Sequence, residues 1–349
     1  MVQQFEHDRR TFLAAALAAI GAAGMPFGAT AQDKSFANRK LVATVFGGRS
    51  MEVMQSDVFD KLTAETGMSI SGVPLLSGAA FARMKAEANG PQIDLFNFSG
   101  GQQTQAKRDG LTQSLTGMKM MDKVPPTLRD PDGHWVSWGV IAEGILYRTD
   151  KISTPPTSYL DFLKPEYKGH VAFPAISNGY GVDFLVMLAR ANGGSEKDIG
   201  PGFELLKRIA ADAAIFKAAP DVQTQFAQND IWIMPYDAAS AMVSSAMGLP
   251  VAFAAPKEGV PTVRLAGCVT KNSQNSDLAC AMLDRLLAPE VQLRLAKVTG
   301  WVPVNSEVVL PAELAAALPS QDKFISLDRD VINAQVAGWV DRFSKEIAR

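Results

Sequence analysis

The residue types that perform nucleophilic or acid–base chemistry are few in this sequence, and their spacing forms no catalytic set. Histidines stand only at positions 7, 134 and 170, and the second and third lie in polar loop contexts where they are poor candidates for a general base. A serine hydrolase of the Gly-x-Ser-x-Gly type needs a nucleophile elbow. The nearest match, Ser99 in NFSGG, lacks the first glycine. We therefore expect no enzyme and no cofactor.

The sequence also gives little indication of metal binding or of a disulfide bond. Cys268 and Cys280 together with three scattered histidines give no zinc-type cluster, so no metal is expected. Both cysteines lie in apolar runs, which favours two buried thiols. Pairing in an oxidising compartment stays open as the alternative.

Glycine-rich loops follow several β-rich runs, and helical patterns follow the loops. The run Lys40–Gly48 predicts a strand that ends in two glycines, and apolar residues then recur at helical spacing from Ser50, a candidate N-cap, to Gly67. Later strands are predicted in MSISGVPLL, IDLFNFSGG, GVIAEGILYRTDKI, KGHVAFP, NDIWIMPYD and TVRLAGCVT. Helices are predicted between most of them. This alternation indicates an α/β fold with largely parallel sheets.

Length and composition narrow the class of protein further. The chain has 349 residues, which exceeds the about 250–300 residues at which one hydrophobic core stops growing, so two lobes are expected. It is 47% hydrophobic and 20% charged, as in compact globular proteins. The net charge of −2 gives no electrostatic case for nucleic-acid binding.

The N-terminus has the pattern of an export signal. Arg9 and Arg10 in DRRTFL resemble the twin-arginine motif, although Asp8 stands where Ser or Thr is usual. The alanine-rich run that follows is too short for a membrane span, and Ala29-Thr30-Ala31 fits a signal-peptidase site. We expect residues 1–31 to be removed and the product to be periplasmic, without stable membrane insertion. An uncleaved anchor is the alternative.

Five stretches, in this order, resemble the spermidine/putrescine-type periplasmic solute-binding proteins of ABC importers. They are FDKLTAETGMSI; IDLFNFSG with KRDGL; GILYRTDKI with PPTSYLDFLKPEYKGHVAFP; AAPKEGVPTVRLAGCVTKNSQN; and LLAPEVQLRLAKVTGWVPVN. FLKPEYKG and PKEG are the most specific pieces. The resemblance covers most of the chain after the signal.

The resemblance implies a two-lobed clamshell of type II, in which each lobe is a mixed, mostly parallel sheet flanked by helices and β-strands form the hinge. Residues 38–142 and 266–320 would form lobe 1, and residues 143–265 lobe 2. Residues 321–349 would form a C-terminal helical segment that packs on the lobes. The ligand would lie in the cleft between lobes, near the carboxyl ends of strands, and hinge closure would signal to the permease.

The loops that this fold turns toward its cleft supply the candidate ligand-binding residues. They are Phe46, Gly47, Gly48, Arg49, Ser99, Tyr180, Tyr236, Asp237, Arg264 and Trp301. Glycines permit close backbone approach, and Arg49 at a helix N-terminus favours an anion. The aromatic side chains suit a cation or a flat apolar solute. Alternatives remain: core packing for Trp301, and an exposed position for Arg49 or Arg264.

Departures from the family pattern bear on the ligand. Polyamine binders hold ammonium groups with carboxylates, because an amine that leaves water must be paired. At the expected positions this sequence has Ala175, Ile176 and Leu265 instead of acids, which leaves Asp237 alone. The family's iron-carrying relatives use adjacent tyrosines, and the tyrosines here include no such pair in sequence.

We therefore expect the periplasmic binding component of an ABC importer, acting as a monomer with inner-membrane permease subunits. Its solute would carry a carboxylate or phosphonate group or resemble an amino acid, because Arg49 and Arg264 match such groups. A true putrescine or spermidine binder and an exported ligand-sensing protein are alternatives, and an exported hydrolase is the least favoured.

Overall fold

The computed structural model describes residues 36–216, 222–228 and 231–347. The predicted export signal, residues 1–31, lies outside them. Within the described ranges, none of the helices has the length and hydropathy of a membrane-spanning segment.

Strands and helices alternate along the chain, as the sequence predicts. The strands are β1 (Lys40–Val45), β2 (Ser69–Pro74), β3 (Leu95–Ser99), β4 (Thr112–Gln113), β5 (Val136–Arg148), β6 (Ala172–Pro174), β7 (Ala214–Phe216), β8 (Ile233–Asp237), β9 (Val251–Ala254), β10 (Val260–Thr270) and β11 (Phe324–Ile325). The α-helices are α1 (Ser50–Val53), α2 (Asp60–Thr66), α3 (Ser77–Ala86), α4 (Gln102–Arg108), α5 (Gly179–Ala191), α6 (Gly200–Ala210), α7 (Val222–Ala227), α8 (Ala238–Ala246), α9 (Ser276–Leu287), α10 (Pro289–Thr299), α11 (Ala312–Ala317) and α12 (Arg329–Glu346).

The first predicted helix is one continuous element with a π-helical middle. A π-helical segment, Met54–Phe59, joins α1 to α2. Gly67 ends the helix with φ 78°, the left-handed conformation that glycine adopts without steric cost. The predicted N-cap is wrong by one residue. Ser50 is already helical, Arg49 precedes it without a side-chain cap, and the Ser50 hydroxyl donates to the Gly47 carbonyl instead, at 3.2 Å.

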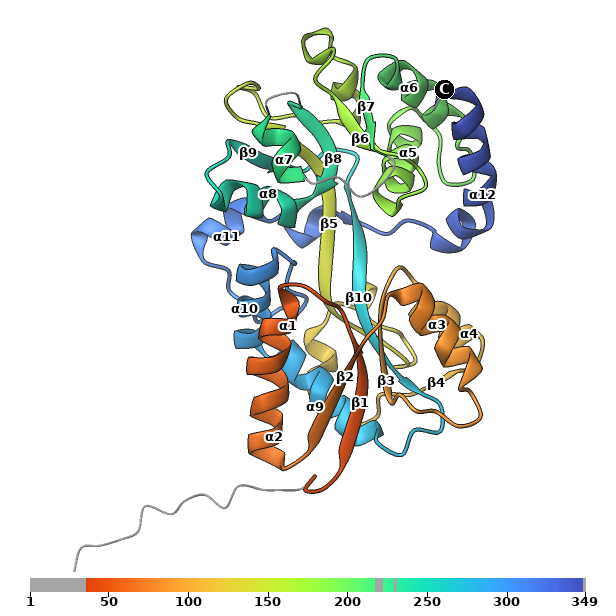
Figure 1. Cartoon of the computed structure of the whole chain (residues 1–349), viewed down its shortest axis with the longest axis vertical. Helices are drawn as coiled ribbons and strands as arrows, with labels where there is room; N and C mark the ends of the chain where they lie inside the picture. Colours follow the sequence, from red (N-terminus) through yellow and green to blue (C-terminus); the bar gives the residue numbers. More distant parts are fainter. Residues whose placement is uncertain (1–35, 217–221, 229–230, 348–349) are drawn as a thin grey trace, which may run out of the picture.

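Two long strands, β5 and β10, join the lower and upper halves of the molecule (Figure 1). They pair with each other antiparallel, from Thr262 opposite Ala142 to Gly267 opposite Val136. In the lower half β10 also pairs with β3, and in the upper half β5 pairs with β8 and β9. The antiparallel pairs among the named strands all involve β5 or β10.

The remaining pairs within each half are parallel, as strand–helix alternation requires. In the lower half β1 lies between β2 and β3, and in the upper half β6 pairs with β7. Helices flank both sheets (Figure 1). The architecture is therefore mixed α/β, with parallel strands at the sides and two long antiparallel strands that connect the halves.

The hydrophobic core is divided in the same way. One cluster packs β1 and β5 against α9 and α10 in the lower half. A second packs α5 and α6 in the upper half and includes Ile332, Trp339 and Phe343 of α12. The C-terminal helix therefore buries its apolar side on the upper half. Cys268 and Cys280 are buried free thiols, and burial raises the pKa of the Cys280 thiol to about 11.

Candidate functional site

Asp237 ends one strand and begins the next helix, with no loop between β8 and α8. It is 5% exposed. Its Oδ1 accepts a hydrogen bond from the Ser240 backbone N–H at 2.7 Å, and its Oδ2 accepts one from the Ser240 hydroxyl at 3.2 Å. Asp237 is thus the N-cap of α8, and the cap fixes the direction of its carboxylate.

Tyr180 reaches the same carboxylate from α5. Its hydroxyl donates to Asp237 Oδ2 at 2.7 Å. Its ring stacks on that of Tyr236 with centroids 4.1 Å apart and planes 22° from parallel. A Cβ at Gly181 would lie 2.3 Å from the Pro174 carbonyl oxygen, so only glycine lets α5 start this close to β6. That close approach places Tyr180 beside β8.

Glu143 adds a buried acid that the sequence analysis did not include. It lies on β5 directly opposite Asp237 on β8 and is 6% exposed. Burial raises the pKa of Glu143 well above its ordinary value, and the Asp183 carboxylate raises it further. Burial also raises the pKa of Asp237, against the hydrogen bonds from Tyr180 and Ser240 that lower it. These acids therefore favour the neutral form more than exposed acids do.

Asp183, one helical turn after Tyr180, is held by a cation. Arg329 at the start of α12 donates to both of its carboxylate oxygens at 2.6 Å. Burial alone would lower the pKa of Arg329, but the Asp183 carboxylate holds it above the ordinary value. A two-pronged pair of this kind fixes orientation as well as charge.

In the lower half, three aromatic rings form a row. Phe46 after β1 lies 6.0 Å from Trp138 on β5, and Trp138 lies 5.7 Å from Trp301 after α10, edge to face. The row meets the upper half through the residue before Trp301. A Cβ on Gly300 would lie 2.5 Å from the Ala239 Cα in α8, two residues after Asp237. The two aromatic groups therefore approach the junction of the halves together.

We call Phe46, Trp138, Trp301, Tyr180, Tyr236 and Asp237 the aromatic site. Gly47, Gly48 and Arg49 follow Phe46 and are all exposed. A Cβ on either glycine would meet no atom within 4 Å, so the loop borders open space. Arg49 has neither a hydrogen bond nor an ion pair within the described ranges.

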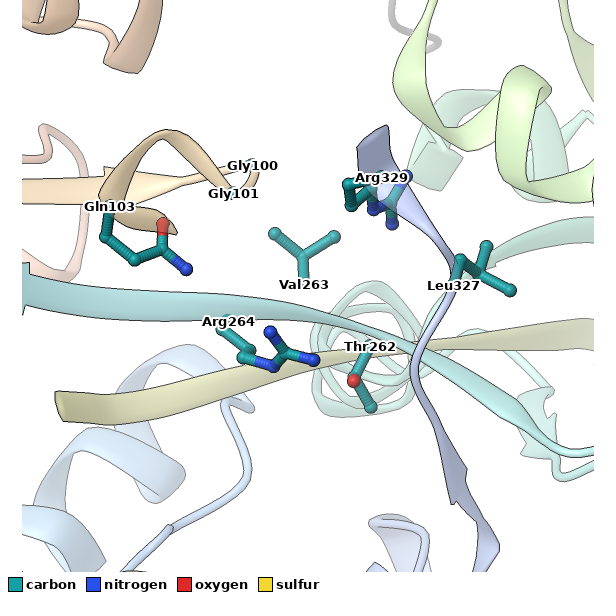
Figure 2. A pocket seen from close by; sticks show the side chains of 8 residues that line it. All are labelled: Gly100, Gly101, Gln103, Thr262, Val263, Arg264, Leu327 and Arg329. Atoms are coloured by element: carbon teal, nitrogen blue, oxygen red, sulfur yellow. The ribbon is translucent and has the colours of Figure 1, made fainter. Parts of the chain in front are cut away.

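Two predicted residues do not join this group. Ser99 is tied to Ser77 at the start of α3, whose hydroxyl lies 3.1 Å from its own. Arg264 points away from Leu265, its neighbour on β10. Leu265 packs in the core beside Gly139, whereas the Arg264 guanidinium lies 5.9 Å above the Trp135 ring, in another cluster. Figure 2 shows Arg264 in a separate pocket with Gln103 and Arg329.

Sequence reasoning missed Trp138, Glu143, Asp183 and Arg329. Glu143 carried a usable signal, because it is an acid inside a long β-rich run, where charged residues are rarely buried without a partner. Arg329 carried none, since its contact with Asp183 joins positions 146 residues apart. The pairing of Tyr180 and Tyr236 was also invisible, because it depends on how α5 packs beside β8.

The sequence is similar to those of known proteins. Residues 90–335 match the model of a family described as bacterial extracellular solute-binding protein. A curated relative, Iron uptake protein A1 of a Synechocystis strain, is 25% identical over 77% of this chain and 79% of its own length. The spermidine/putrescine-binding periplasmic protein of Salmonella typhimurium is 24% identical over 80% and 82%.

Solved structures confirm the predicted fold class, the mixed α/β fold of periplasmic binding proteins. A putative extracellular solute-binding protein from Bordetella parapertussis superposes with a TM-score of 0.80 at 21% identity, covering 89% of this chain and 99% of that one. Similarity at this level of identity supports the fold alone.

Proposed function

Because this chain belongs to the bacterial extracellular solute-binding proteins, which are not enzymes, we propose that it binds a small organic solute between its two halves. The solute lies at the aromatic site and is delivered to an ABC permease of the inner membrane. The observation that carries this proposal is the close approach of Gly300, the residue before Trp301, to Ala239, two residues after Asp237. This approach brings one aromatic group from each half toward the junction of the halves. Figure 1 shows that these strands carry the chain between the halves.

The solute we propose has an anionic group, a carboxylate or phosphonate, and a portion that packs on aromatic rings. Arg49 supports the anionic group, since it is exposed beside Phe46 and unpaired within the described residues. Asp237 gives little support for an amine. Its two oxygen atoms already accept three hydrogen bonds from Tyr180 and Ser240. These bonds leave room for about one more donor, which is too little for an ammonium group that must lose its water.

A thermal-shift screen of the protein without residues 1–31 tests the proposal. The panel holds carboxylates, phosphonates, amino acids, putrescine and spermidine. A ligand at about one hundred times its Kd adds about 2.7 kcal/mol of stability, which shifts Tm measurably. We expect the carboxylates or phosphonates to raise Tm and Arg49→Gln to remove the effect. A strong shift with putrescine or spermidine only would contradict the anionic class.

Arg208→Gln is the matched control for this screen. Arg208 is exposed on α6 and has no ion pair within the described ranges. The substitution removes the same charge from a surface in the upper half. Retention of the full shift in this variant separates a local effect of Arg49 from an effect of net charge.

Ferric iron is a second candidate, because the structure brings Tyr180 and Tyr236 together although they are far apart in sequence. Two phenolate oxygens and a carboxylate are hard donors that suit ferric iron, and a relative is named for iron uptake. Burial and the nearby Asp237 carboxylate raise the pKa of both tyrosines, so metal binding would have to displace their protons. A visible tyrosinate-to-iron band with ferric citrate, lost in Tyr236→Phe, is the expected sign of this candidate.

A further inference from the structure

Buried polar atoms without partners gather at one place in this molecule. Six buried side-chain atoms lack a hydrogen-bond partner among the described residues: Gln102 Oε1, Gln103 Nε2 and Oε1, Trp135 Nε1, Ser137 Oγ and Arg264 Nε. Four of the six belong to Gln102, Gln103 and Arg264, and these residues line two adjoining cavities. An unpaired buried polar atom costs about 1–3 kcal/mol, so such a concentration requires an explanation.

The inner cavity has a volume of about 30 Å³ and is lined by Gly100, Gly101, Gln103, Thr262, Val263, Arg264, Leu327 and Arg329. The outer one, of about 210 Å³, shares Gly100, Gly101, Arg264, Leu327 and Arg329 with it. Gln103 is fully buried. Figure 2 shows Gln103 and Arg264 at one end of the pocket and the segment that carries Leu327 and Arg329 at the other.

The charges around the inner cavity do not balance. Arg329 is neutralised by Asp183. Arg264 has no carboxylate partner within the described ranges, and its one hydrogen-bond acceptor is the Ser326 hydroxyl, 2.5 Å from Nη2. Burial lowers the pKa of Arg264, and the positive charge of Arg329 lowers it further. Two guanidinium groups thus line one cavity, and within the described residues the carboxylates that act on them, Asp183 first among them, act on Arg329 and not on Arg264.

Of the two acids of the outer cavity, one is paired with a cation and the other caps a helix. Asp330 pairs with Arg108 at 2.5 Å, and Asp328 accepts the Val331 backbone N–H as the cap of α12. Neither carboxylate lines the inner cavity. An anion therefore meets Arg264 and Gln103 at the inner end without facing a free carboxylate there.

We propose that this pocket, formed by Arg264, Gln103, Gly100–Gly101 and Arg329, is an accessory binding site for a small oxyanion that carries a carboxylate or phosphate group. Arg264 Nε and the Gln103 amide N–H donate to the oxyanion, and the rest of the molecule occupies the outer cavity. A guanidinium fork matches both kinds of group. The site lies apart from the aromatic site, since Arg264 and Leu265 point to opposite faces of β10.

An oxyanion bound in this accessory site would also link the two halves. Gly100, Gly101 and Gln103 belong to the lower half, next to β3, whereas Arg329 begins the helix that packs on the upper half. A Cβ on Gly101 would lie 3.6 Å from the Arg329 Cβ. An oxyanion between them adds contacts to both halves and therefore stabilises the relative position that the structure shows.

The test is titration with inorganic phosphate at constant ionic strength, followed by thermal shift and calorimetry on the protein without residues 1–31. We expect a saturable rise in Tm for the unsubstituted protein and an apparent Kd at least about tenfold weaker in Arg264→Gln, since one charge-assisted hydrogen bond is lost. Arg208→Gln, the same change on an exposed surface, should keep the full response. Citrate and acetate in parallel titrations distinguish a phosphate from a carboxylate preference.

Gln103→Leu is the second variant, and it guards against misfolding of Arg264→Gln. It replaces an unpaired buried amide by an apolar group of similar shape, so without phosphate its Tm should be unchanged or higher, while phosphate binding weakens. The proposal is overturned if the unsubstituted protein shows no saturable response, as a cavity holding only water would give. It is also overturned if Arg264→Gln and Gln103→Leu both keep the response.

Arg49→Gln separates this site from the aromatic site. If phosphate binding is lost in Arg49→Gln and kept in Arg264→Gln, phosphate binds at the junction of the halves and the accessory site is refuted. If the solute that raises Tm in the thermal-shift screen binds normally to Arg264→Gln, the proposed function stands whatever phosphate does.

Discussion

The aromatic site and the accessory site formed by Arg264, Gln103, Gly100–Gly101 and Arg329, here called the arginine pocket, lie close to the same two strands. They differ in how their polar atoms are paired. At the aromatic site the Asp237 oxygens accept three hydrogen bonds from neighbouring residues. In the arginine pocket the Gln103 amide and Arg264 Nε have no partner in the described part of the chain. The carboxylate of the first region is satisfied without a ligand, while the second region has donors that only a ligand or water can satisfy.

The largest expected effect is a loss of stability when the ion pair between Asp183 and Arg329 is broken. Asp183→Asn leaves the Arg329 guanidinium partly buried without its carboxylate, and its repulsion of Arg264 is then uncompensated. We expect the free energy of unfolding to fall by about 3 kcal/mol, measured by urea denaturation. Asp341→Asn, which breaks an exposed pair with Lys345, should change it by less than about 0.5 kcal/mol.

Arg264→Met completes this comparison. It removes a guanidinium that has no carboxylate partner in the described ranges, so its cost in urea denaturation should be far below that of Asp183→Asn. If both variants lose equal stability, Arg264 is paired in solution and the contrast between the two arginines is wrong.

A smaller decrease in the free energy of unfolding is expected for a substitution at the aromatic site. Asp237→Ala removes the N-cap of α8 together with the acceptor of the Tyr180 hydroxyl. Because the cap and a buried hydrogen bond are lost together, unfolding should become easier by about 2 kcal/mol. Asp328→Ala removes a cap at the start of α12 that holds no aromatic side chain. Its loss should be about half as large, and equal losses would mean that Tyr180 gains nothing from Asp237.

At pH values above the ordinary pKa of a glutamate, the pH dependence of stability should be set by Glu143. Since the folded protein raises the pKa of this acid, folding binds a proton between the ordinary pKa and the raised one. Stability is therefore full at the lower end of that window and is lost as pH rises toward the raised pKa, by about 1.4 kcal/mol for each pH unit crossed. Asp237 has its pKa raised in the same direction.

Glu143→Gln isolates this effect. The variant cannot ionise at that position, so its free energy of unfolding should vary less between about pH 5 and pH 8 than that of the unsubstituted protein, in parallel urea titrations. Acids whose pKa is lowered, such as Asp277 beside Arg39, destabilise the fold only at more acidic pH. An identical slope in both proteins would show that Glu143 ionises freely.

Local sequence patterns predicted most of the fold. Alternating β-rich runs and helical periods located β1, α5 and α10 because each depends on the residues within it. The cap of the first helix failed by one residue, since the Ser50 hydroxyl bonds back to Gly47. Likewise, the predicted loop after β8 is absent because Asp237 serves both the strand and the helix.

The candidate site was less predictable because it is assembled from distant segments. Residue types suggested Tyr180, Tyr236 and Asp237 one by one, but the stacking and the shared carboxylate require the packing of α5 beside β8. The direction of Arg264 depends on the strand face that the core takes. Leu265 fills that face, and alternation then sends Arg264 to the other side.

The smallest expected effect compares the two hydroxyls of the tyrosine pair. Tyr180→Phe keeps the ring but removes the donor to Asp237, so unfolding should become easier by about 1 kcal/mol. The Tyr236 hydroxyl has no hydrogen bond within residues 36–216, 222–228 and 231–347, so Tyr236→Phe should cost less than about 0.5 kcal/mol by urea denaturation. If ferric iron is the ligand, Tyr236→Phe should weaken binding more than Tyr180→Phe does. Among the described residues, the Tyr236 oxygen has no hydrogen bond to give up before it coordinates the metal. Loss of solute binding in Tyr236→Phe with unchanged stability would therefore favour iron over an organic solute, whereas a shared, modest loss in both variants would favour stacking on the rings.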